Sequence, residues 1–417
     1  MTAEKLSRAR AIEVVALLMA INCLNLLDRN LPFILTEVIR KDLHLSDTQI
    51  GMLGGIFFAG VYTLGGVPLG RLADRGYARP VIAASVAVWS LLTWAGGRSQ
   101  NFTQLALARL GVAAGEAGAT PPSHAIIAQT FPEERRATML AVFQTGAPMG
   151  AMLGLMLGGW LLENFGWRNA FAFVGLPGMV LAALAYWRLP DTPKPAPVVN
   201  ESSLLRSALS LFAIPTFTIN ALACASYAFA AYAAVTWLPG FFQRVHGLSA
   251  GQTGLWLGLV TGISGIIGMP VCGYLADRLS VRHPSWRLRV PAICMAISAP
   301  FVLAMFKVSD WRLALALYFI PQALTIAYLG PAFSAAHAVV PAHMRGLASS
   351  VLLGTLTLIG AGLGPPIIGA ISDAMGAASD NTSLAKALLL LPAMLVLSSG
   401  LFWWASRRLP GDLYRAA

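Results

Sequence analysis

Four charged side chains in this sequence lie deep inside apolar segments, where an unpartnered charge is costly. Asp28 and Arg29 are adjacent within the apolar segment 11–38, and Arg109 and Glu116 share a later one. A charge in such surroundings must face other polar groups or water to be tolerated. These residues are therefore candidates for moving a proton or binding a charged ligand.

Helix geometry predicts which of these charges meet. At about 1.5 Å per residue, Asp28 lies roughly 20 Å from the start of its segment, and Arg109 and Glu116 lie roughly 10 and 20 Å into theirs. Adjacent helix residues point about 100° apart, so Asp28 and Arg29 cannot face the same partner. We expect Arg29 to face a central cavity and reach Glu116. We expect Asp28 to face between helices, toward Arg109 or the backbone.

These residue types suit proton-linked transport of an anion. Desolvation raises and a neighbouring Arg lowers the pKa of a carboxyl group, so a conformational change can make it load or release a proton. Arg stays charged and recognises carboxylate or phosphate groups. We expect Asp28 and Glu116 to carry protons beside Arg109, and Arg29, with Asn25, to bind the anion or act as a switching cation. The alternative is a static ion-pair network that only orders two helices.

The composition is that of a polytopic membrane protein. The 417 residues are 57% hydrophobic and 11% charged, with a mean hydropathy of +0.67, whereas soluble domains carry about 25% charged residues. The net charge of +11 follows the positive-inside rule, because most Lys and Arg fall in loops on the same side as the N-terminus. Nucleic-acid binding is therefore excluded. The four cysteines lie in apolar segments without the spacing of a metal site or disulfide framework.

Twelve apolar segments are long enough to cross a bilayer as helices. They lie at about 11–38, 48–70, 79–97, 103–130, 137–161, 168–188, 214–241, 250–276, 289–307, 312–340, 346–371 and 383–406. The gap 189–213 is rich in Pro and then in Leu, which predicts a cytoplasmic linker with a short interfacial helix. We predict an all-α membrane protein with two six-helix bundles, 1–188 and 214–417.

The two halves of the sequence repeat. The pattern G-x4-G-x3-D-R closes the second segment at 65–75 and the eighth at 268–278. Parallel repeats of six helices are one plan of membrane transporters. An Asp in such a short loop can pair with an Arg across it. The pairs expected from the repeat are Asp74 with Arg135 or Arg136, and Asp277 with Arg345; the alternative is ordinary solvated loop charges.

The second half has no Asp, Glu, Lys or Arg deep in its apolar segments. It offers instead Tyr227, Tyr232, Trp237, Trp256, Tyr318, Gln322 and Tyr328. We expect Tyr227, Tyr232 and Gln322 to contact the apolar part of an amphipathic substrate whose head meets Arg29 and Glu116. The alternative is a belt of aromatic residues at the membrane interfaces. The side chains of His124 and His337 lie near span ends, where we expect capping or packing.

The sequence resembles the major facilitator superfamily over essentially its whole length, through the G-x4-G-R-x-x-D-R motif at 65–75 and its echo at 268–278. The resemblance implies a major facilitator fold of 12 transmembrane helices. It also implies a cytoplasmic gate in which the Asp74 and Asp277 pairs, with Arg75, latch the two halves and break as the protein opens inward.

Several further motifs resemble the Spinster-like branch of this superfamily. They are N-x-x-D-R at Asn25–Arg29, R-x5-G-E-A at Arg109–Ala117, the stretch 131–137, and the region 237–249. The resemblance implies a proton-linked or facilitative carrier of sphingoid or lysophospholipid molecules. It also implies that Asp28, Arg29 and Glu116 take part in coupling. The chain is expected to be a monomer in a bacterial inner membrane, in contact with lipid, with both termini in the cytoplasm.

Other functions fit the sequence less well. Proton symporters of sugar acids share N-x-x-D-R and a fourth-span Glu-Ala, but they carry further polar residues in the second half, which this chain lacks. A membrane-embedded enzyme would need a motif such as HExxH or GxSxG, and the sequence has neither. An uncoupled scramblase would leave the buried charges without a purpose. We expect no metal or organic cofactor.

Overall fold

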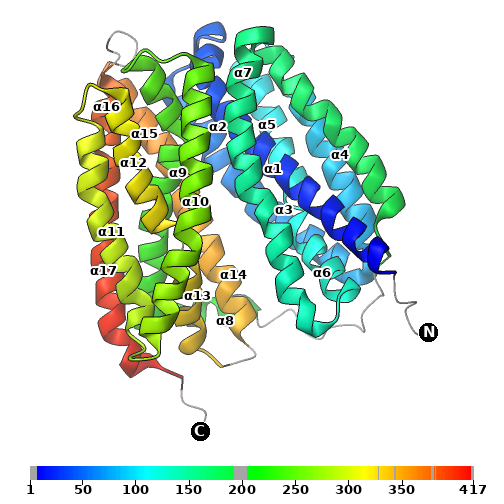
Figure 1. Ribbon diagram of the computed structural model, residues 1–417, viewed down its shortest axis with the longest axis vertical. Helices are drawn as coiled ribbons and strands as arrows, with labels where there is room; N and C mark the ends of the chain where they lie inside the picture. The colour runs from blue at the N-terminus through cyan, green and yellow to red at the C-terminus, as the bar shows by residue number, and fades with distance from the viewer. Residues whose placement is uncertain are drawn as a thin grey trace. The chain divides into compact units, whose positions relative to one another are not determined.

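The computed structural model describes residues 7–191, 204–326, 328–341, 344–376, 380 and 382–414. All regular structure in these residues is helical (Figure 1). The all-α fold predicted from the sequence is therefore confirmed. The helices are α1 (Arg8–Asp42), α2 (Asp47–Gly54), α3 (Ile56–Leu72), α4 (Ala78–Gly96), α5 (Phe102–Glu116), α6 (Thr120–Thr130), α7 (Glu133–Arg188), α8 (Leu204–Leu211), α9 (Pro215–Arg244), α10 (Ala250–Ser280), α11 (Trp286–Met305), α12 (Trp311–Thr325), α13 (Leu329–Ala338), α14 (Arg345–Thr355), α15 (Gly362–Ala374), α16 (Ser383–Leu388) and α17 (Leu390–Asp412), with π-helical turns η1 (Ala73–Tyr77) and η3 (Leu356–Ala361).

Ten helical stretches among the described residues are long and apolar enough to cross a membrane. The predicted segments 137–161 and 168–188 run together in α7, whose 56 residues would measure about 84 Å if straight. Gly166, with φ 77° and ψ 162°, breaks this helix. The predicted segment 103–130 is divided by a turn at 117–119, so neither part reaches spanning length alone. The fusion of two predicted segments in α7 and the division of segment 103–130 account for the difference between the ten helical stretches and the twelve predicted segments.

The chain forms two compact units that differ from the two halves of the sequence. The first unit comprises Met1–Leu45, Phe57–Pro197 and Ser249–Gly258, and the second comprises Ser46–Ile56, Val198–Leu248 and Leu259–Ala417. Each unit thus includes the start of a span that continues in the other. The division into 1–188 and 214–417 stays a prediction. Of the linker 189–213, residues 192–203 lie outside the described residues, and the expected short helix is present as α8.

Within the first unit, α1 and α7 approach closely because α7 presents small residues to α1 (Figure 1). A Cβ atom on Gly150 would lie 2.0 Å from the carbonyl oxygen of Cys23, and one on Gly154 would lie 2.6 Å from that of Leu27. Glycines at four-residue spacing allow such contact between membrane helices. This packing occupies one face of α1 and leaves other faces for α4 and α5.

Within the second unit, α9 is the central helix and packs against α15 and α17 (Figure 1). Its side chains Phe217, Trp237 and Phe241 are fully buried. The indole nitrogen of Trp237 donates to the carbonyl oxygen of Pro365 over 2.9 Å. Such a buried donor must be paired, so Trp237 has a structural role in joining α9 to α15.

Candidate functional site

Asp28 of α1 is almost completely buried, with 1% of its surface exposed. Its Oδ2 accepts a hydrogen bond from the hydroxyl group of Thr93 in α4. Its Oδ1 lies 3.9 Å from Nη1 of Arg109 in α5, which is too long for a hydrogen bond. The predicted contact between Asp28 and Arg109 is therefore confirmed, as an ion pair without a direct hydrogen bond.

Glu116, the last residue of α5, forms an ion pair with Arg29 of α1. Nε and Nη2 of Arg29 donate to the same oxygen, Oε2, over 2.9 and 2.6 Å. Nη2 also lies 3.5 Å from the amide oxygen of Asn25, one turn earlier. The predicted contact between Arg29 and Glu116 is confirmed. The Glu116 side chain is fully buried, whereas 18% of the Arg29 side chain is exposed, so part of this cation remains accessible.

Two aromatic rings of α3 lie against the guanidinium groups. Arg29 is 4.7 Å from the ring centroid of Phe58 and 4.8 Å from that of Tyr62, and Arg109 is 5.7 Å from Phe58. Such cation–π contacts are worth about 0.5–2 kcal/mol, with the larger values where water is excluded. Neither ring is among the predicted site residues, although their four-residue spacing, which places them on one helix face, is visible in the sequence.

We call Asp28, Arg29, Arg109 and Glu116 the charged cluster. Within the part of the chain that the structure describes, Asp28 Oδ1, Arg109 Nη1, Glu116 Oε1 and the amide nitrogen of Asn25 are buried without a hydrogen-bond partner. Buried polar atoms are normally paired, so this cluster is incomplete. The charges of its two carboxylates and two guanidinium groups sum to zero. A proton added to either carboxylate removes the negative charge opposite one of the guanidinium groups. The arrangement can therefore link protonation to the release of Arg29 or Arg109.

The second unit contains an apolar cavity of about 90 Å³ between α9, α11, α12 and α17. It brings together Tyr227, Tyr318 and Gln322, and adds Thr325, which was not predicted. The Tyr227 hydroxyl donates to Thr325 over 2.9 Å, and the Tyr318 hydroxyl donates to Gln322 over 3.2 Å. These bonds pair both tyrosine hydroxyls within the cavity wall, and the rest of the lining is mainly apolar.

The remaining predicted aromatic residues lie elsewhere. Tyr232 is not among the residues that line this cavity, and Trp237 is in the packed core described above. The Tyr328 ring lies against that of Tyr227, tilted by 59°, with ring centroids 4.3 Å apart. Trp256 lies in the first unit and is 42% exposed. The cavity therefore gathers part of the predicted set.

The predicted cytoplasmic gate is described only in part. The side chains of Asp74 and Asp277 lie outside the described residues. The cations of the gate are exposed: Arg75, Arg135, Arg136 and Arg345. The guanidinium Nε of Arg136 donates to the carbonyl oxygen of Phe131 over 3.1 Å. The gate stays a prediction.

The histidines near span ends make packing contacts, as expected. The His124 ring lies edge-on to Phe143, with centroids 5.4 Å apart. His337 stacks on Phe333, and its Nε2 lies 2.7 Å from the hydroxyl oxygen of Ser349. Among the described residues, no group of three or more His, Cys, Asp or Glu side chains could hold a metal ion.

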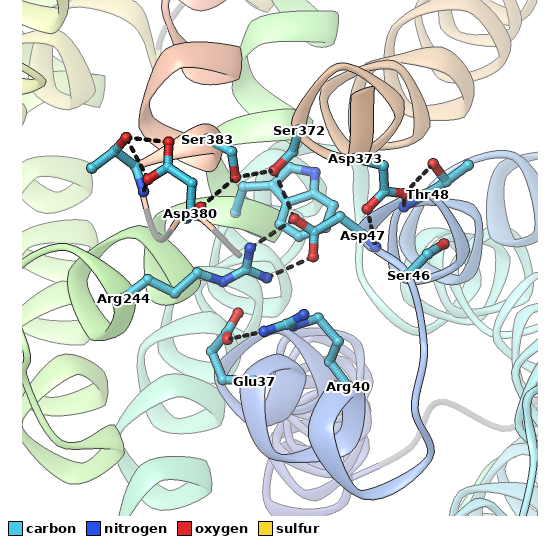
Figure 2. A network of polar contacts seen from close by, with 12 residues as sticks. Glu37, Arg40, Ser46, Asp47, Thr48, Arg244, Ser372, Asp373, Asp380 and Ser383 are labelled. Carbon is cyan, nitrogen blue, oxygen red and sulfur yellow. Dashed lines mark hydrogen bonds and ion pairs between the residues drawn. The ribbon is translucent and has the colours of Figure 1, made fainter. Parts of the chain in front are cut away.

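A second polar network, which the sequence did not indicate, lies in the second unit (Figure 2). Nη1 and Nη2 of Arg244, at the end of α9, donate to the two carboxylate oxygens of Asp47, each over 2.7 Å. The Ser372 hydroxyl donates to the same carboxylate over 2.7 Å. Asp373 accepts the backbone N–H groups of Asp47 and Thr48 over 3.0 and 2.8 Å. The network ties the start of α2 to α9 and α15.

Comparison with known proteins agrees with this architecture. Residues 18–365 match the model of the Major Facilitator Superfamily. An MFS-type efflux pump of Mycolicibacterium smegmatis is 36% identical over 420 residues, covering 98% of this chain and 95% of that protein. The probable L-galactonate transporter of Escherichia coli K12 is 27% identical over 319 residues, covering 73% of this chain and 70% of that protein.

A solved structure is also similar. The crystal structure of a bacterial homologue of the human lysosomal transporter Spinster, in an inward-facing and unoccupied conformation, has a TM-score of 0.88 and 27% sequence identity, covering 99% of this chain and 100% of that one. The predicted Spinster-like resemblance is confirmed. Proteins of the matched family are transporters of small molecules and not enzymes. The chain therefore belongs to the major facilitator superfamily and is a multi-pass membrane transporter with a Spinster-like structure.

Proposed function

We propose that the protein couples protons to the movement of an amphipathic substrate, such as a sphingoid or lysophospholipid-like molecule, by alternating access. In this proposal Asp28 and Glu116 carry protons, and Arg29 binds the anionic head group or acts as the switching cation. Arg109 balances Asp28. Protonation of Glu116 and binding of the head group to Arg29 therefore favour each other, because each separates the same ion pair.

The observation that carries the proposal is the geometry of the Arg29–Glu116 pair. Both donors of Arg29 bind Oε2, and Oε1 has no hydrogen-bond partner among the described residues. A proton on Glu116 removes the charge that holds Arg29. The Arg29 guanidinium is partly exposed already and has the planar donor geometry that binds a phosphate or carboxylate. A static network would instead be expected to pair its buried atoms.

The amphipathic substrate is supported by the contrast between the units. The first supplies the cation, while the second supplies the cavity beside Tyr227 and Gln322 with an apolar interior suited to an alkyl chain. Tyr232 remains a proposed substrate contact outside that cavity. The Spinster-like resemblance of the sequence implies the same substrate class, and the likeness to the bacterial Spinster homologue extends that resemblance to the fold.

We place the protein as a monomer in the inner membrane of a bacterium, with both termini in the cytoplasm. The support is the excess of Lys and Arg in the loops on the side of the N-terminus. Protease accessibility of tags on the two termini in spheroplasts and in inverted vesicles tests this topology. Cleavage of either tag in intact spheroplasts would contradict it.

A second candidate is a proton symporter of a sugar acid. It is favoured by the similarity to the probable L-galactonate transporter and by the cation of Arg29, which would bind a sugar carboxylate equally well. The apolar cavity of the second unit would then have no substrate to contact. The two candidates differ in whether an alkyl chain is required for binding.

Flux into liposomes distinguishes the candidates. Purified protein is reconstituted, a pH gradient is imposed, and uptake of sphingosine phosphate or lysophospholipid is compared with uptake of L-galactonate. We expect flux of an amphipath that responds to the gradient, loss of that response in Glu116→Gln, and at least a tenfold higher KM in Arg29→Ala. The exposed Arg98 provides the matched control, and Arg98→Ala should behave as wild type. Flux of L-galactonate alone would favour the symporter, and an unaltered pH response in Glu116→Gln would refute coupling through that residue.

A further inference from the structure

The Thr93 hydroxyl donates to a carboxylate on another helix, as those of the first-turn residues Thr48 and Thr216 also do, whereas many threonines in the described helices bond within their own helix. Several of these donate to the backbone carbonyl four residues earlier, over 2.8–3.1 Å: Thr36, Thr236, Thr253, Thr325 and Thr355. This is the usual local bond of a helical threonine. The Thr93 hydroxyl instead donates across to Oδ2 of Asp28 on a neighbouring helix. It serves the carboxylate and not its own helix.

No other hydrogen bond holds the Asp28 carboxylate among the described residues, because Oδ1 is unpaired. From α5, Arg109 approaches to 3.9 Å, and Glu116 is engaged by Arg29, the neighbour of Asp28 on α1. From α3, Phe58 and Tyr62 lie against the guanidinium groups. From α7, the residues packed on this part of α1 are the glycines Gly150 and Gly154.

The orientation of the carboxylate therefore depends on Thr93. With Oδ2 held by α4, Oδ1 is directed at Arg109. Both Asp28 and Thr93 are 1% exposed, so water does not replace the bond if it is lost. A hydrogen bond donated by the Thr93 hydroxyl also stabilises the charged form of Asp28 relative to the neutral acid.

We propose that Thr93 is a positioning residue that holds Asp28 for proton exchange and sets the pH at which transport responds. The inference rests on the proposed function, because it requires Asp28 to carry a proton. It adds a neutral side chain on α4 to a coupling site otherwise built from charges on α1 and α5. Thr93 acts through Asp28 and need not touch the substrate.

Two substitutions separate the hydroxyl group from the size of the side chain. Thr93→Val keeps the shape and removes the donor, whereas Thr93→Ser keeps the donor. Counterflow of sphingosine phosphate or lysophospholipid, the amphipathic probes of the flux assay, is measured in liposomes with the same pH on both sides, across a range of pH. We expect the midpoint of the pH profile to move upward by about one unit in Thr93→Val, as the loss of a hydrogen bond to a charged group predicts. Thr93→Ser should keep the wild-type midpoint, and KM should change less than twofold in both.

Ser90 provides the matched control on the same helix. It is 1% exposed, and its hydroxyl has no hydrogen-bond partner among the described residues. Ser90→Ala removes a buried hydroxyl one turn from Thr93 without touching Asp28. The pH midpoint should stay at the wild-type value. Thermal unfolding of each purified variant shows whether it is folded, and Thr93→Ala replaces Thr93→Val if the latter is not.

Asp28→Asn distinguishes failure of the inference from failure of the proposed function. If counterflow in Asp28→Asn keeps the wild-type pH profile, Asp28 carries no coupling proton, and both the proposed role of Asp28 and the inference fall. If Asp28→Asn loses the pH response but folded Thr93→Val keeps the wild-type midpoint, the inference alone is overturned. A shift in Thr93→Ser as large as that in Thr93→Val would also overturn it, because the hydroxyl would then not be the cause.

Discussion

Each unit buries an ion pair to nearly the same degree, yet the two pairs are built differently. The side chains of Arg109 and Asp28 in the first unit are 4% and 2% exposed, and those of Arg244 and Asp47 in the second are 4% and 0% exposed. The first pair is separated by 3.9 Å. The second has two hydrogen bonds of 2.7 Å each. Burial alone therefore does not distinguish the two pairs.

The partners around each pair do distinguish them. Ser372 adds a third hydrogen bond to the Asp47 carboxylate (Figure 2), whereas Asp28 and Arg109 each keep a buried polar atom without a hydrogen bond in the described structure. Desolvating two charges is repaid only when their geometry and remaining hydrogen bonds are good. A well-paired network orders the fold, and an incomplete one can change its charge at lower cost. We therefore expect the second pair to serve stability and the first to serve transport.

Removing the cation of each pair should show this difference as the largest effect on stability. Arg244→Leu leaves the buried carboxylate of Asp47 without its guanidinium counter-ion and without the two hydrogen bonds from it, which should lower the free energy of unfolding by about 3–5 kcal/mol. Arg109→Leu removes a cation that makes no direct hydrogen bond to Asp28. Asp28 can take up a proton in response, so this change should cost about 1–2 kcal/mol. Denaturant unfolding of the purified proteins in detergent measures both.

Arg168 supplies a control for the loss of an arginine. It pairs with Asp42 at 2.6 Å, with side chains 42% and 41% exposed, and an exposed pair contributes about 0–1 kcal/mol. Arg168→Leu should therefore be the least harmful of the three. Equal losses for Arg109→Leu and Arg244→Leu would remove the distinction between the two pairs.

The charged cluster was accessible from the sequence because helix geometry constrains it. The depth of these residues along their spans and the angle between adjacent residues predicted the contact of Arg29 with Glu116 and left Arg109 or the backbone as the partner of Asp28. The rings of Phe58 and Tyr62 and the hydroxyl of Thr93 were not predicted, because neutral residues are ordinary in apolar helices. Which of them faces the charges depends on the rotation of α3 and α4 about their axes, which packing sets.

The network around Asp47 was beyond prediction for a different reason. Asp47 and Arg244 lie at the ends of spans far apart in the sequence, where a charge is ordinarily solvated and carries no signal. No local sequence pattern indicates which span ends lie next to each other in the fold. The internal repeat is clear at 65–75 and 268–278. These motifs lie at the ends of the second and eighth predicted segments, whereas Asp47 lies at the beginning of the second.

Those beginnings offer a second comparison of the two units. The sequence Ser46–Gln49 forms a reciprocal cap at the start of α2, and Ser249–Gln252 forms the equivalent bonds, of 3.2 and 3.3 Å, at the start of α10. In both cases a carboxylate from another helix also accepts backbone N–H groups of the first turn, which favour an anion. Asp373 serves α2, and Glu163 of α7 accepts the N–H of Gly251 over 2.8 Å.

Neutralising these carboxylates should give a smaller effect than breaking the Arg244 pair. Asp373 accepts three hydrogen bonds, from the backbone of Asp47 and from the backbone and hydroxyl of Thr48, so Asp373→Asn should cost about 1–2 kcal/mol. Glu163 accepts one hydrogen bond from the first turn of α10. Glu163→Gln should therefore lower the free energy of unfolding by about 0.5–1 kcal/mol. Unfolding in detergent ranks them, and a larger loss for Glu163→Gln would contradict the ranking.

The smallest effect is expected from Asp380, an exposed carboxylate close to the network of the second unit (Figure 2). Hydrogen bonds from Thr382 and then from Lys386 lower the pKa of Asp380 from 3.8 to about 2. A carboxyl group whose pKa falls on folding stabilises the fold above its ordinary pKa, and this stabilisation is lost as the pH falls through about 2. Between pH 5 and 8 the group is charged whether the chain is folded or not. Asp380→Asn should therefore leave the pH midpoint of counterflow unchanged, while its unfolding should depend less on pH than that of the wild type below about pH 4. A shifted midpoint of counterflow in this variant would show that the pH response is not confined to the charged cluster of the first unit.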